Sequence, residues 1–233
     1  MAGRLKGKKA LITGASSGIG AGVAVAFAKE GADVVINFPN KQQEANAKKV
    51  AAAVRKAGGK AYLVQADVSK EGPVRRLVKE SLKRLGRIDI LINNAGIDSG
   101  APVEKMPIAM WDEMIGVNLR SVFLVTHFVL PHMYKQGSGK IVNNASQLAY
   151  LGSAGLSHYC AAKAGIIGFT RSLSREIGDR NINANCVAPG ATYTPILEAV
   201  EEDHLKAIKA MIPKGELARV DQIVPAFVYL ASE

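Results

Sequence analysis

Hydrophobic residues along the chain alternate between short apolar runs and longer segments with helical spacing. The short runs are rich in β-branched residues and occupy residues 9–13, 33–38, 61–65, 88–93, 140–144 and 182–187. Near-continuous apolar runs of this length are typical of strands buried on both faces of a sheet. Amphipathic helical patterns lie between them, at about residues 19–30, 41–57, 70–85, 110–135 and 157–177. The alternation predicts an α/β fold, a Rossmann-type doubly wound parallel sheet with helices on both faces.

The segment after the sixth run departs from this alternation. Residues 189–217 are bounded by prolines and amphipathic, and they are long for a connection within a compact domain. Because insertions beyond strand ends often close over a substrate, we expect a lid at about residues 191–215. A last helix is expected at about residues 219–231. The whole chain, residues 1–233, is therefore expected to form a single domain with this lid.

Composition narrows the class of protein. With 48% hydrophobic and 21% charged residues, the chain has the balance of a folded globular domain. The net charge of +10 is spread along helical segments, which favours solvated helix faces and no nucleic-acid partner, although it also suits an acidic substrate. The longest apolar runs are too short to span a bilayer, so no membrane partner is expected. Cys160 and Cys186 have no metal or redox spacing, which favours no metal site and a cytoplasmic location.

The first strand leads into a glycine-rich turn, TGASSGIG, at residues 13–20. Gly14, Gly18 and Gly20 permit a tight turn and a close approach of the backbone to a phosphate. The start of the following helix presents free N–H groups and a partial positive charge. The spacing G-x-x-x-G-x-G differs from the dinucleotide fingerprint G-x-G-x-x-G, and a plain strand-to-helix turn is the alternative. Its place after the first strand favours phosphate binding.

Tyr159 and Lys163 stand four residues apart on an expected helix, so their side chains share one face. A tyrosine has an ordinary pKa near 10 and needs help to exchange a proton at neutral pH. A neighbouring ammonium favours the phenolate, and lowering the pKa by roughly three units requires about 4 kcal/mol. The alternative is an amphipathic surface pair. The histidine before the tyrosine points about 100° away on a helix, which argues against a catalytic histidine.

Four motifs in order resemble those of the short-chain dehydrogenase/reductase family, in its shorter, oxidoreductase branch. They are TGASSGIG at 13–20, NNAG at 93–96, Tyr159-x-x-x-Lys163 and PG at 189–190, and the resemblance covers essentially the whole chain. It implies an enzyme that transfers a hydride between a nicotinamide and a carbonyl or secondary alcohol. By this resemblance Ser146 holds the substrate carbonyl, and Asn118 anchors a water near the lysine. The expected catalytic residues are Asn118, Ser146, Tyr159 and Lys163.

The resemblance also implies a cofactor site along the ends of the strands. The residues expected there are Gly14, Ser16, Ser17, Gly18, Ile19, Gly20, Asn37, Asp67, Val68, Asn94, Ala95, Gly96, Tyr159, Lys163, Pro189, Gly190, Thr192 and Thr194. A helix-capping role is the alternative for Asp67. The second strand ends in INFPNKQQ with no carboxylate before Glu44, and an acid there would repel a 2′-phosphate. We therefore expect NADP, with NAD as the alternative.

The substrate and assembly stay open at this stage. The sequence is similar both to 3-oxoacyl-carrier-protein reductases and to bacterial glucose dehydrogenases, so a 3-oxoacyl thioester or related ketone is expected, with a sugar as the alternative. A catalytically silent NAD(P)-binding regulator is the other class. The resemblance implies a homodimer or homotetramer that joins the helices at 110–135 and 157–177. It also implies a seventh strand, which the chain, ending at Glu233, does not contain.

Overall fold

The computed structural model describes residues 3–198 and 201–233, and its central sheet has the predicted class. Six parallel strands lie in the order β3-β2-β1-β4-β5-β6. All six predicted strands are confirmed to within two residues: β1 (Lys9–Ile12), β2 (Asp33–Phe38), β3 (Ala61–Gln65), β4 (Ile90–Asn93), β5 (Gly139–Asn144) and β6 (Ile182–Val187). The direction of winding reverses between β1 and β4, so a crevice is expected beyond their carboxyl ends.

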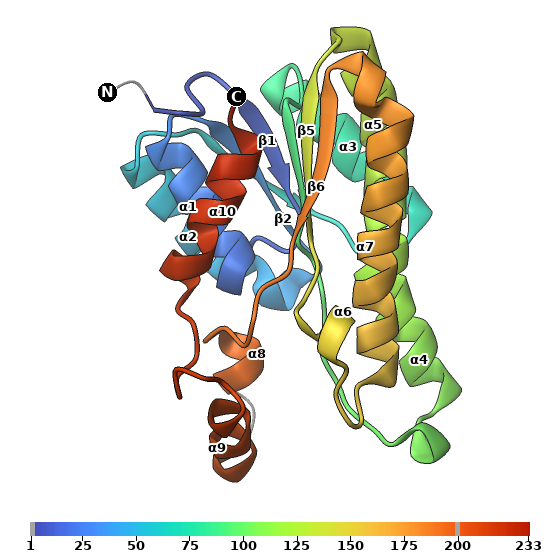
Figure 1. Cartoon of the computed structure of the whole chain (residues 1–233). Coiled ribbons are helices and arrows are strands. Elements are labelled where there is room, and N and C mark those ends of the chain that lie inside the picture. The colour runs from blue at the N-terminus through green and yellow to red at the C-terminus, as the bar shows by residue number, and fades with distance from the viewer. Residues whose placement is uncertain (1–2, 199–200) are drawn as a thin grey trace.

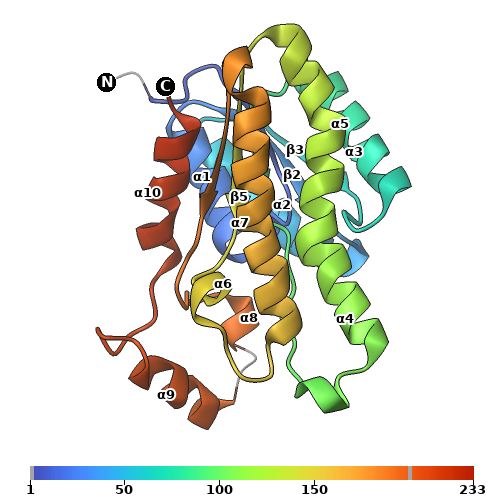
Figure 2. The same ribbon diagram turned by 45° about the vertical axis from the view of Figure 1, so that its right-hand side comes forward.

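Helices cover both faces of the sheet (Figures 1 and 2). One layer contains α1 (Gly18–Lys29), α2 (Glu44–Lys56) and α10 (Val220–Ala231); the other contains α3 (Glu71–Leu85), α5 (Ser121–Gln136) and α7 (Ser157–Ile177). Side chains of successive strand residues point to opposite layers. Ile12 accordingly packs in the core beneath α1 and α10, whereas Leu11 packs in the core beneath α3, α5 and α7. Both faces of the sheet are covered by helices and shielded from solvent, which explains the continuous apolar runs in the sequence.

The helix expected at 110–135 is longer and contains an irregularity. It consists of α4 (Ile108–Ile115), a π-helical segment (Gly116–Arg120, labelled η3) and α5. By length and composition Ile108–Gln136 could cross a membrane, but half of its most apolar window is buried inside the protein, as in a core helix. π-helical turns inside α-helices are frequent at functional sites, and this one contains Asn118.

The segment after β6 leaves the sheet and returns to it. It contains α8 (Pro195–Glu198) and α9 (Glu202–Ala210), which project beyond the carboxyl ends of the strands (Figure 1). Its two ends are joined, because Tyr193 N–H donates to the Ala218 carbonyl at 2.8 Å and Ala218 N–H donates to the Ala191 carbonyl at 3.0 Å. Residues 199–200 of the expected lid lie outside the described residues. Short elements η1 (Lys41–Gln43), η2 (Val103–Lys105), α6 (Leu148–Leu151) and η4 (Gly178–Arg180) complete the fold.

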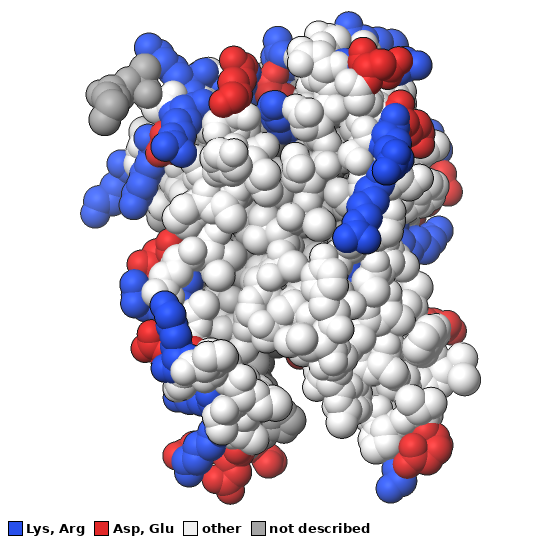
Figure 3. Space-filling model, viewed as in Figure 1, with Lys and Arg blue, Asp and Glu red and all other residues white. Residues whose placement is uncertain are grey.

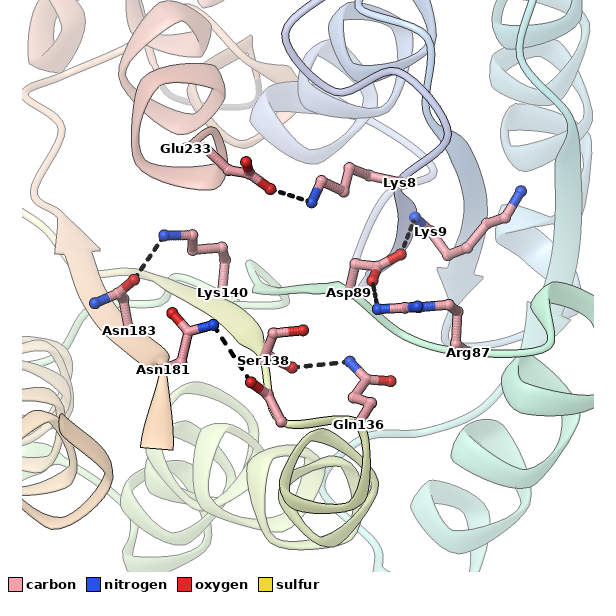
Figure 4. A network of polar contacts seen from close by, with 11 residues as sticks. Lys8, Lys9, Arg87, Asp89, Gln136, Ser138, Lys140, Asn181, Asn183 and Glu233 are labelled. Atoms are coloured by element: carbon pink, nitrogen blue, oxygen red, sulfur yellow. Dashed lines mark hydrogen bonds and ion pairs between the residues drawn. The ribbon is translucent and has the colours of Figure 1, made fainter. Parts of the chain in front are cut away.

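Polar contacts close the opposite end of the sheet, where the strands begin (Figure 4). Asp89 accepts a hydrogen bond from the Lys9 N–H at 2.9 Å and forms an ion pair with Arg87. Lys8 pairs with Glu233, which fastens the end of the chain to the start of β1. The crevice therefore opens at one end of the sheet, the end where the predicted site residues lie.

Candidate active site

The glycine-rich turn connects β1 to α1 in a conformation that requires glycine. Gly14 has φ of 59°, and a Cβ there would come within 2.6 Å of the Ala95 Cα, so no other residue type fits this approach. Ser17, with φ of −157°, is the extended residue that precedes α1. The first N–H groups of α1 have no acceptor within the helix, and its first turn contains no acidic residue. The turn therefore fits a pyrophosphate.

Asn37 supports this turn from the end of β2. Its side chain is 1% exposed, its Oδ1 accepts the Gly14 N–H at 3.2 Å, and its Nδ2 donates to the Ala66 carbonyl at 3.0 Å. The hydrogen bonds of Asn37 thus lie within the protein, and they set the distance between the turn and β3. Ser16 lies beside η1, with its hydroxyl 3.4 Å from the Gln43 Oε1.

The expected adenine-contacting residues follow β3. Val68 is buried, and Asp67 accepts hydrogen bonds from the Ser69 N–H at 3.0 Å and the Ser69 hydroxyl at 2.6 Å. Burial acts to raise the pKa of Asp67, but these hydrogen bonds and the charge of Lys70 outweigh it and hold the pKa below its ordinary value. The residue preceding α3 is Lys70, so Asp67 shapes the turn ahead of the helix and does not cap it directly.

The residues after β4 are fastened to the glycine-rich turn. Thr13 Oγ1 accepts the Asn94 N–H at 2.9 Å and the Ala95 N–H at 3.1 Å, and Asn94 Nδ2 donates to the carbonyls of Thr13 and Gly14, both at 3.0 Å. A Cβ on Gly20 would clash with the Asn94 side chain, which explains the third glycine of the motif. The NNAG motif and the turn therefore form one rigid wall of the crevice.

Ser146, Tyr159 and Lys163 meet at the carboxyl end of β5. Ser146 follows the strand, is 7% exposed, and its hydroxyl lies close enough to Tyr159 to influence the pKa of the phenol. Tyr159 and Lys163 lie on the first turns of α7, with the Lys163 Nζ 5.6 Å from the centre of the tyrosine ring. Lys163 is 4% exposed and donates to the Asn144 carbonyl at 2.8 Å. The three groups expected from the sequence are thus brought together in one cluster, in which Ser146 and Lys163 are buried and Tyr159 is partly buried.

Burial dominates the protonation of this cluster. It raises the pKa of Tyr159 to about 12, with a further increase from the Asp98 charge, while the nearby Ser146 hydroxyl acts in the opposite direction. Burial also lowers the pKa of Lys163 to about 8, against the attraction of Asp98. From the sequence we expected the ammonium to lower the pKa of Tyr159; in the structure, desolvation of the phenolate raises that pKa instead. Tyr159 is therefore a protonated donor at neutral pH.

Asn118 fastens the π-helical segment to the loop after β4. Its Oδ1 accepts the Ile97 N–H at 2.8 Å, and its Nδ2 donates to the Ile97 carbonyl at 2.9 Å. A Cβ on Gly96 would lie 3.1 Å from the Asn118 Oδ1 and 3.7 Å from the Lys163 Nζ. The asparagine and the lysine thus flank the same glycine, and both border the buried cluster.

The segment after β6 covers the crevice from the other side. The Pro189 carbonyl accepts the Gln147 N–H at 2.9 Å, Thr192 Oγ1 donates to the Gly190 carbonyl at 2.9 Å, and a Cβ on Gly18 would lie 3.4 Å from Thr194. This segment therefore spans from the catalytic loop to the glycine-rich turn. Figure 3 shows a cleft between the lobe of α8 and α9 and the lobe of α4 and α6, with few charged side chains at its rim.

Two further buried residues lie in this region, and one of them, Asn144, was not among the residues that the sequence predicted for the site. Asn144, the last residue of β5, donates from Nδ2 to the Asn94 Oδ1 at 3.0 Å. His158 is fully buried, and neither of its ring nitrogens has a hydrogen-bond partner among the described residues. The second asparagine in IVNN, at a strand position where an apolar residue is expected, was the available signal for Asn144. A depression of about 530 Å³ beside β3, lined by Arg55, Lys60 and Arg84, lies away from these residues.

Comparison with known proteins agrees with this geometry. Residues 8–205 match the short chain dehydrogenase family. A 3-oxoacyl-(acyl-carrier-protein) reductase of Thermotoga maritima is 38% identical over 99% of this chain and 92% of its own length. A subunit of a hydroxy(phenyl)methylsuccinyl-CoA dehydrogenase of Thauera aromatica is 39% identical over 98% of this chain and 91% of its own length.

A solved structure gives the same result for the fold. A short chain dehydrogenase of Burkholderia cenocepacia, determined in complex with NADP, superposes with a TM-score of 0.90 at 33% identity, over 99% of this chain and 92% of that one. The predicted family and fold are thereby confirmed. The chain belongs to the short chain dehydrogenase family and is an oxidoreductase that acts on alcohol and ketone groups with a nicotinamide cofactor.

Proposed function

We propose that this enzyme reduces 3-oxoacyl thioesters, or closely related ketones, with NADPH. The observation that carries the proposal is the cluster of Ser146, Tyr159 and Lys163, in which the serine and the lysine are buried and a protonated, partly buried tyrosine lies beside the serine at the mouth of the crevice. Such a pair presents two hydroxyl groups to one carbonyl oxygen, and one of them has a proton to give.

The residues divide the work of the reaction between them. The nicotinamide, when bound, supplies the hydride that adds to the carbonyl carbon. Ser146 orients the carbonyl oxygen, and Tyr159 donates its proton to that oxygen, so that a secondary alcohol forms. The Lys163 ammonium, 5.6 Å from the centre of the ring, stabilises the resulting phenolate and can supply the proton that restores the tyrosine. Asn118 holds the loop beside the lysine, and we assign it the anchoring of a proton path.

The cofactor would lie across the ends of the central strands. We assign its pyrophosphate to the turn at Gly14–Gly20, its adenine to the neighbourhood of Asp67 and Val68, and its nicotinamide to the region between Gly96 and the segment Pro189–Thr194. Asn37 contributes through the turn, since its side-chain hydrogen bonds hold the backbone of Gly14. Ser16 and Lys41 border the end of β2, where no carboxylate opposes a 2′-phosphate; this supports NADP over NAD.

Two of the compared relatives support a thioester substrate. Their names specify an acyl group on a carrier protein and an acyl group on coenzyme A, and both of these are thioesters. The rim of the crevice also presents large apolar side chains, with Leu151 74% exposed and Tyr150 64% exposed on α6. An apolar rim suits an acyl chain better than a sugar. We assign closure over the substrate to residues 191–215, whose joined base leaves α8 and α9 as the moving part.

We further propose that the chain forms a homodimer or homotetramer through α4, α5 and α7. These helices lie on the same side of the sheet (Figure 2). Ile108 is 76% exposed, Phe123 is 50% exposed and Trp111 is 39% exposed on α4 and α5. Covering such side chains favours association. A cytoplasmic enzyme without nucleic-acid or membrane partners is the assignment that fits the dispersed surface charge.

A kinetic screen tests the proposed function. The purified protein is given NADPH or NADH with acetoacetyl-CoA, a simple ketone and, in the oxidative direction, glucose with NADP⁺ or NAD⁺. We expect the highest kcat/KM with acetoacetyl-CoA and NADPH, and a loss of about 10²–10⁴-fold in Tyr159→Phe with NADPH binding intact. Turnover of glucose alone would favour the sugar dehydrogenase, and cofactor binding without any turnover would favour the silent regulator.

A further inference from the structure

The ends of β4 and β5 are held together by side chains where their backbones separate. Backbone pairing of β4 with β5 extends to Asn93 opposite Asn143, whereas β5 stays paired with β6 as far as Asn144 opposite Val187. One residue beyond the last β4–β5 pair, Asn144 Nδ2 donates to Asn94 Oδ1 at 3.0 Å. The hydrogen bond between the Asn144 and Asn94 amides therefore joins β5 to the end of β4 one residue beyond the backbone pairing.

The orientation of both amides is set by their partners. Asn94 Nδ2 donates to two carbonyls of the glycine-rich turn, those of Thr13 and Gly14, so its Oδ1 must face Asn144. Asn144 must then donate through Nδ2, and its own Oδ1 points elsewhere, buried and without a partner among the described residues. A buried amide oxygen without a donor is unfavourable compared with an apolar side chain at the same place. Packing alone thus gives no reason for an asparagine here.

The main chain of Asn144 contacts the catalytic cluster directly. Its carbonyl accepts the hydrogen bond of Lys163 Nζ at 2.8 Å. A continuous polar path therefore runs from the Gly14 carbonyl through Asn94 and Asn144 to Lys163, and no link in it is longer than 3.0 Å. One end of this path is a carbonyl of the turn that is proposed to hold the pyrophosphate. The other end is Lys163, which is proposed to stabilise the tyrosinate.

We propose that Asn144 is a positioning residue, which clamps β5 to the phosphate-binding turn and so fixes Lys163 relative to the bound dinucleotide. The inference rests on the proposed function, because it assigns the dinucleotide to the turn and the lysine to the reaction. Without the clamp, β5 is still held to β4 as far as Asn143, by backbone pairing and by the Asn93 Nδ2 hydrogen bond to Asn143 Oδ1 at 2.8 Å, but Asn144 and the residues after it can shift relative to the turn. Ser146, two residues further on, would move with it. Displacement of reacting groups by about 1 Å lowers the rate by up to about 10²-fold.

The test compares Asn144→Ala with a matched control. Asn183→Ala removes an exposed asparagine of the neighbouring strand, whose side chain accepts a hydrogen bond from Lys140 at the far end of the sheet (Figure 4). For Asn144→Ala we expect kcat with acetoacetyl-CoA to fall at least about tenfold and the Kd for NADPH, measured by fluorescence, to rise. The pH midpoint of kcat that reports Lys163 should move upward, because a loosened strand admits water to the ammonium. Asn183→Ala should match the wild type in all three.

A second variant and a double mutant separate positioning from packing. Asn144→Leu keeps the branched shape of the side chain but not the amide, so it tests the clamp even if Asn144→Ala fails to fold. Asn94→Ala combined with Asn144→Ala should lower the affinity for NADPH no further than Asn94→Ala alone, because both cut one path. Folded Asn144 variants overturn the inference if their kcat and their Kd for NADPH lie within twofold of wild type and their pH midpoint is unchanged. A wild type that binds NADPH without turnover overturns the proposed function instead, and the Kd values still test the clamp.

Discussion

Replacing Lys163 by methionine should make the protein more stable at neutral pH while it abolishes catalysis. The lysine is 4% exposed, and burial lowers its pKa from 10.5 to about 8. That difference corresponds to about 3 kcal/mol against the charged form in the folded state. Methionine has a similar length and no charge, but it gives up the hydrogen bond to the Asn144 carbonyl, worth about 1 kcal/mol. We therefore expect Lys163→Met to raise the free energy of unfolding by about 2 kcal/mol at pH 7.

The pH dependence identifies the cause of this gain. Below pH 8 the lysine is protonated in both the folded and the unfolded wild type, and the full unfavourable effect is present. Between about pH 8 and 10.5 the unfolded state binds more protons than the folded state, so the stability of the wild type rises with pH. The advantage of Lys163→Met should therefore shrink by about 2 kcal/mol between pH 7 and pH 10. Tyr159 titrates in both proteins, so its effect largely cancels in the difference.

Urea unfolding of both proteins at pH 7, 8, 9 and 10 measures this directly, with NADPH titration as the check that the crevice is intact. A variant that is no more stable than wild type at pH 7 would refute the burial argument. A difference between the two proteins that does not change with pH would refute the assignment of the effect to the ammonium.

Three further predictions follow from burial and exposure. Because burial raises the pKa of Tyr159 to about 12 and lowers that of Lys163 to about 8, steady-state carbonyl reduction should be independent of pH from 6 to 7 and should fall near pH 8 as Lys163 loses its proton, whereas alcohol oxidation should accelerate from pH 6 to 7; a flat oxidation profile contradicts this. His158→Leu removes two buried nitrogens without partners and should stabilise the protein by about 1 kcal/mol in urea unfolding, and a loss of stability would show that these nitrogens have a partner. Phe123→Glu places a charge on the exposed face of α5 and should shift light-scattering mass toward the monomer, whereas an unchanged oligomer places the interface elsewhere.

The sequence was sufficient for the fold because both strand and helix signals were strong. Strands buried on both faces are continuous apolar runs, and each predicted strand is confirmed to within two residues. The parallel arrangement then brings the carboxyl ends of β1, β4 and β5 to one end of the sheet, and with them the turn, Asn94 and Ser146. Local pattern and chain topology together therefore located most of the candidate site.

What the sequence did not predict depends on contacts between distant residues. The π-helical turn at Gly116–Arg120 has the same periodic apolar pattern as the helix around it. The raised pKa of Tyr159 depends on how completely the surrounding elements exclude water, which no local motif records. Asn144 was missed because its partner Asn94 lies 50 residues earlier, and a second asparagine at a strand end has no local signature of pairing.

The positions of buried polar atoms that have no hydrogen-bond partner indicate where the site lies, even without any sequence motif. Among residues 3–198 and 201–233, the buried side-chain atoms without partners belong to Asn93, Asn144 and His158. They stand at the end of β4, the end of β5 and the start of α7, around the nearly buried Lys163. Each such atom costs about 1–3 kcal/mol. Departures from ideal burial persist where function requires them, so their confinement to this end of the sheet marks it as the working end. The same reasoning explains why the substitutions that should stabilise this protein most, at Lys163 and His158, lie in and beside its catalytic cluster.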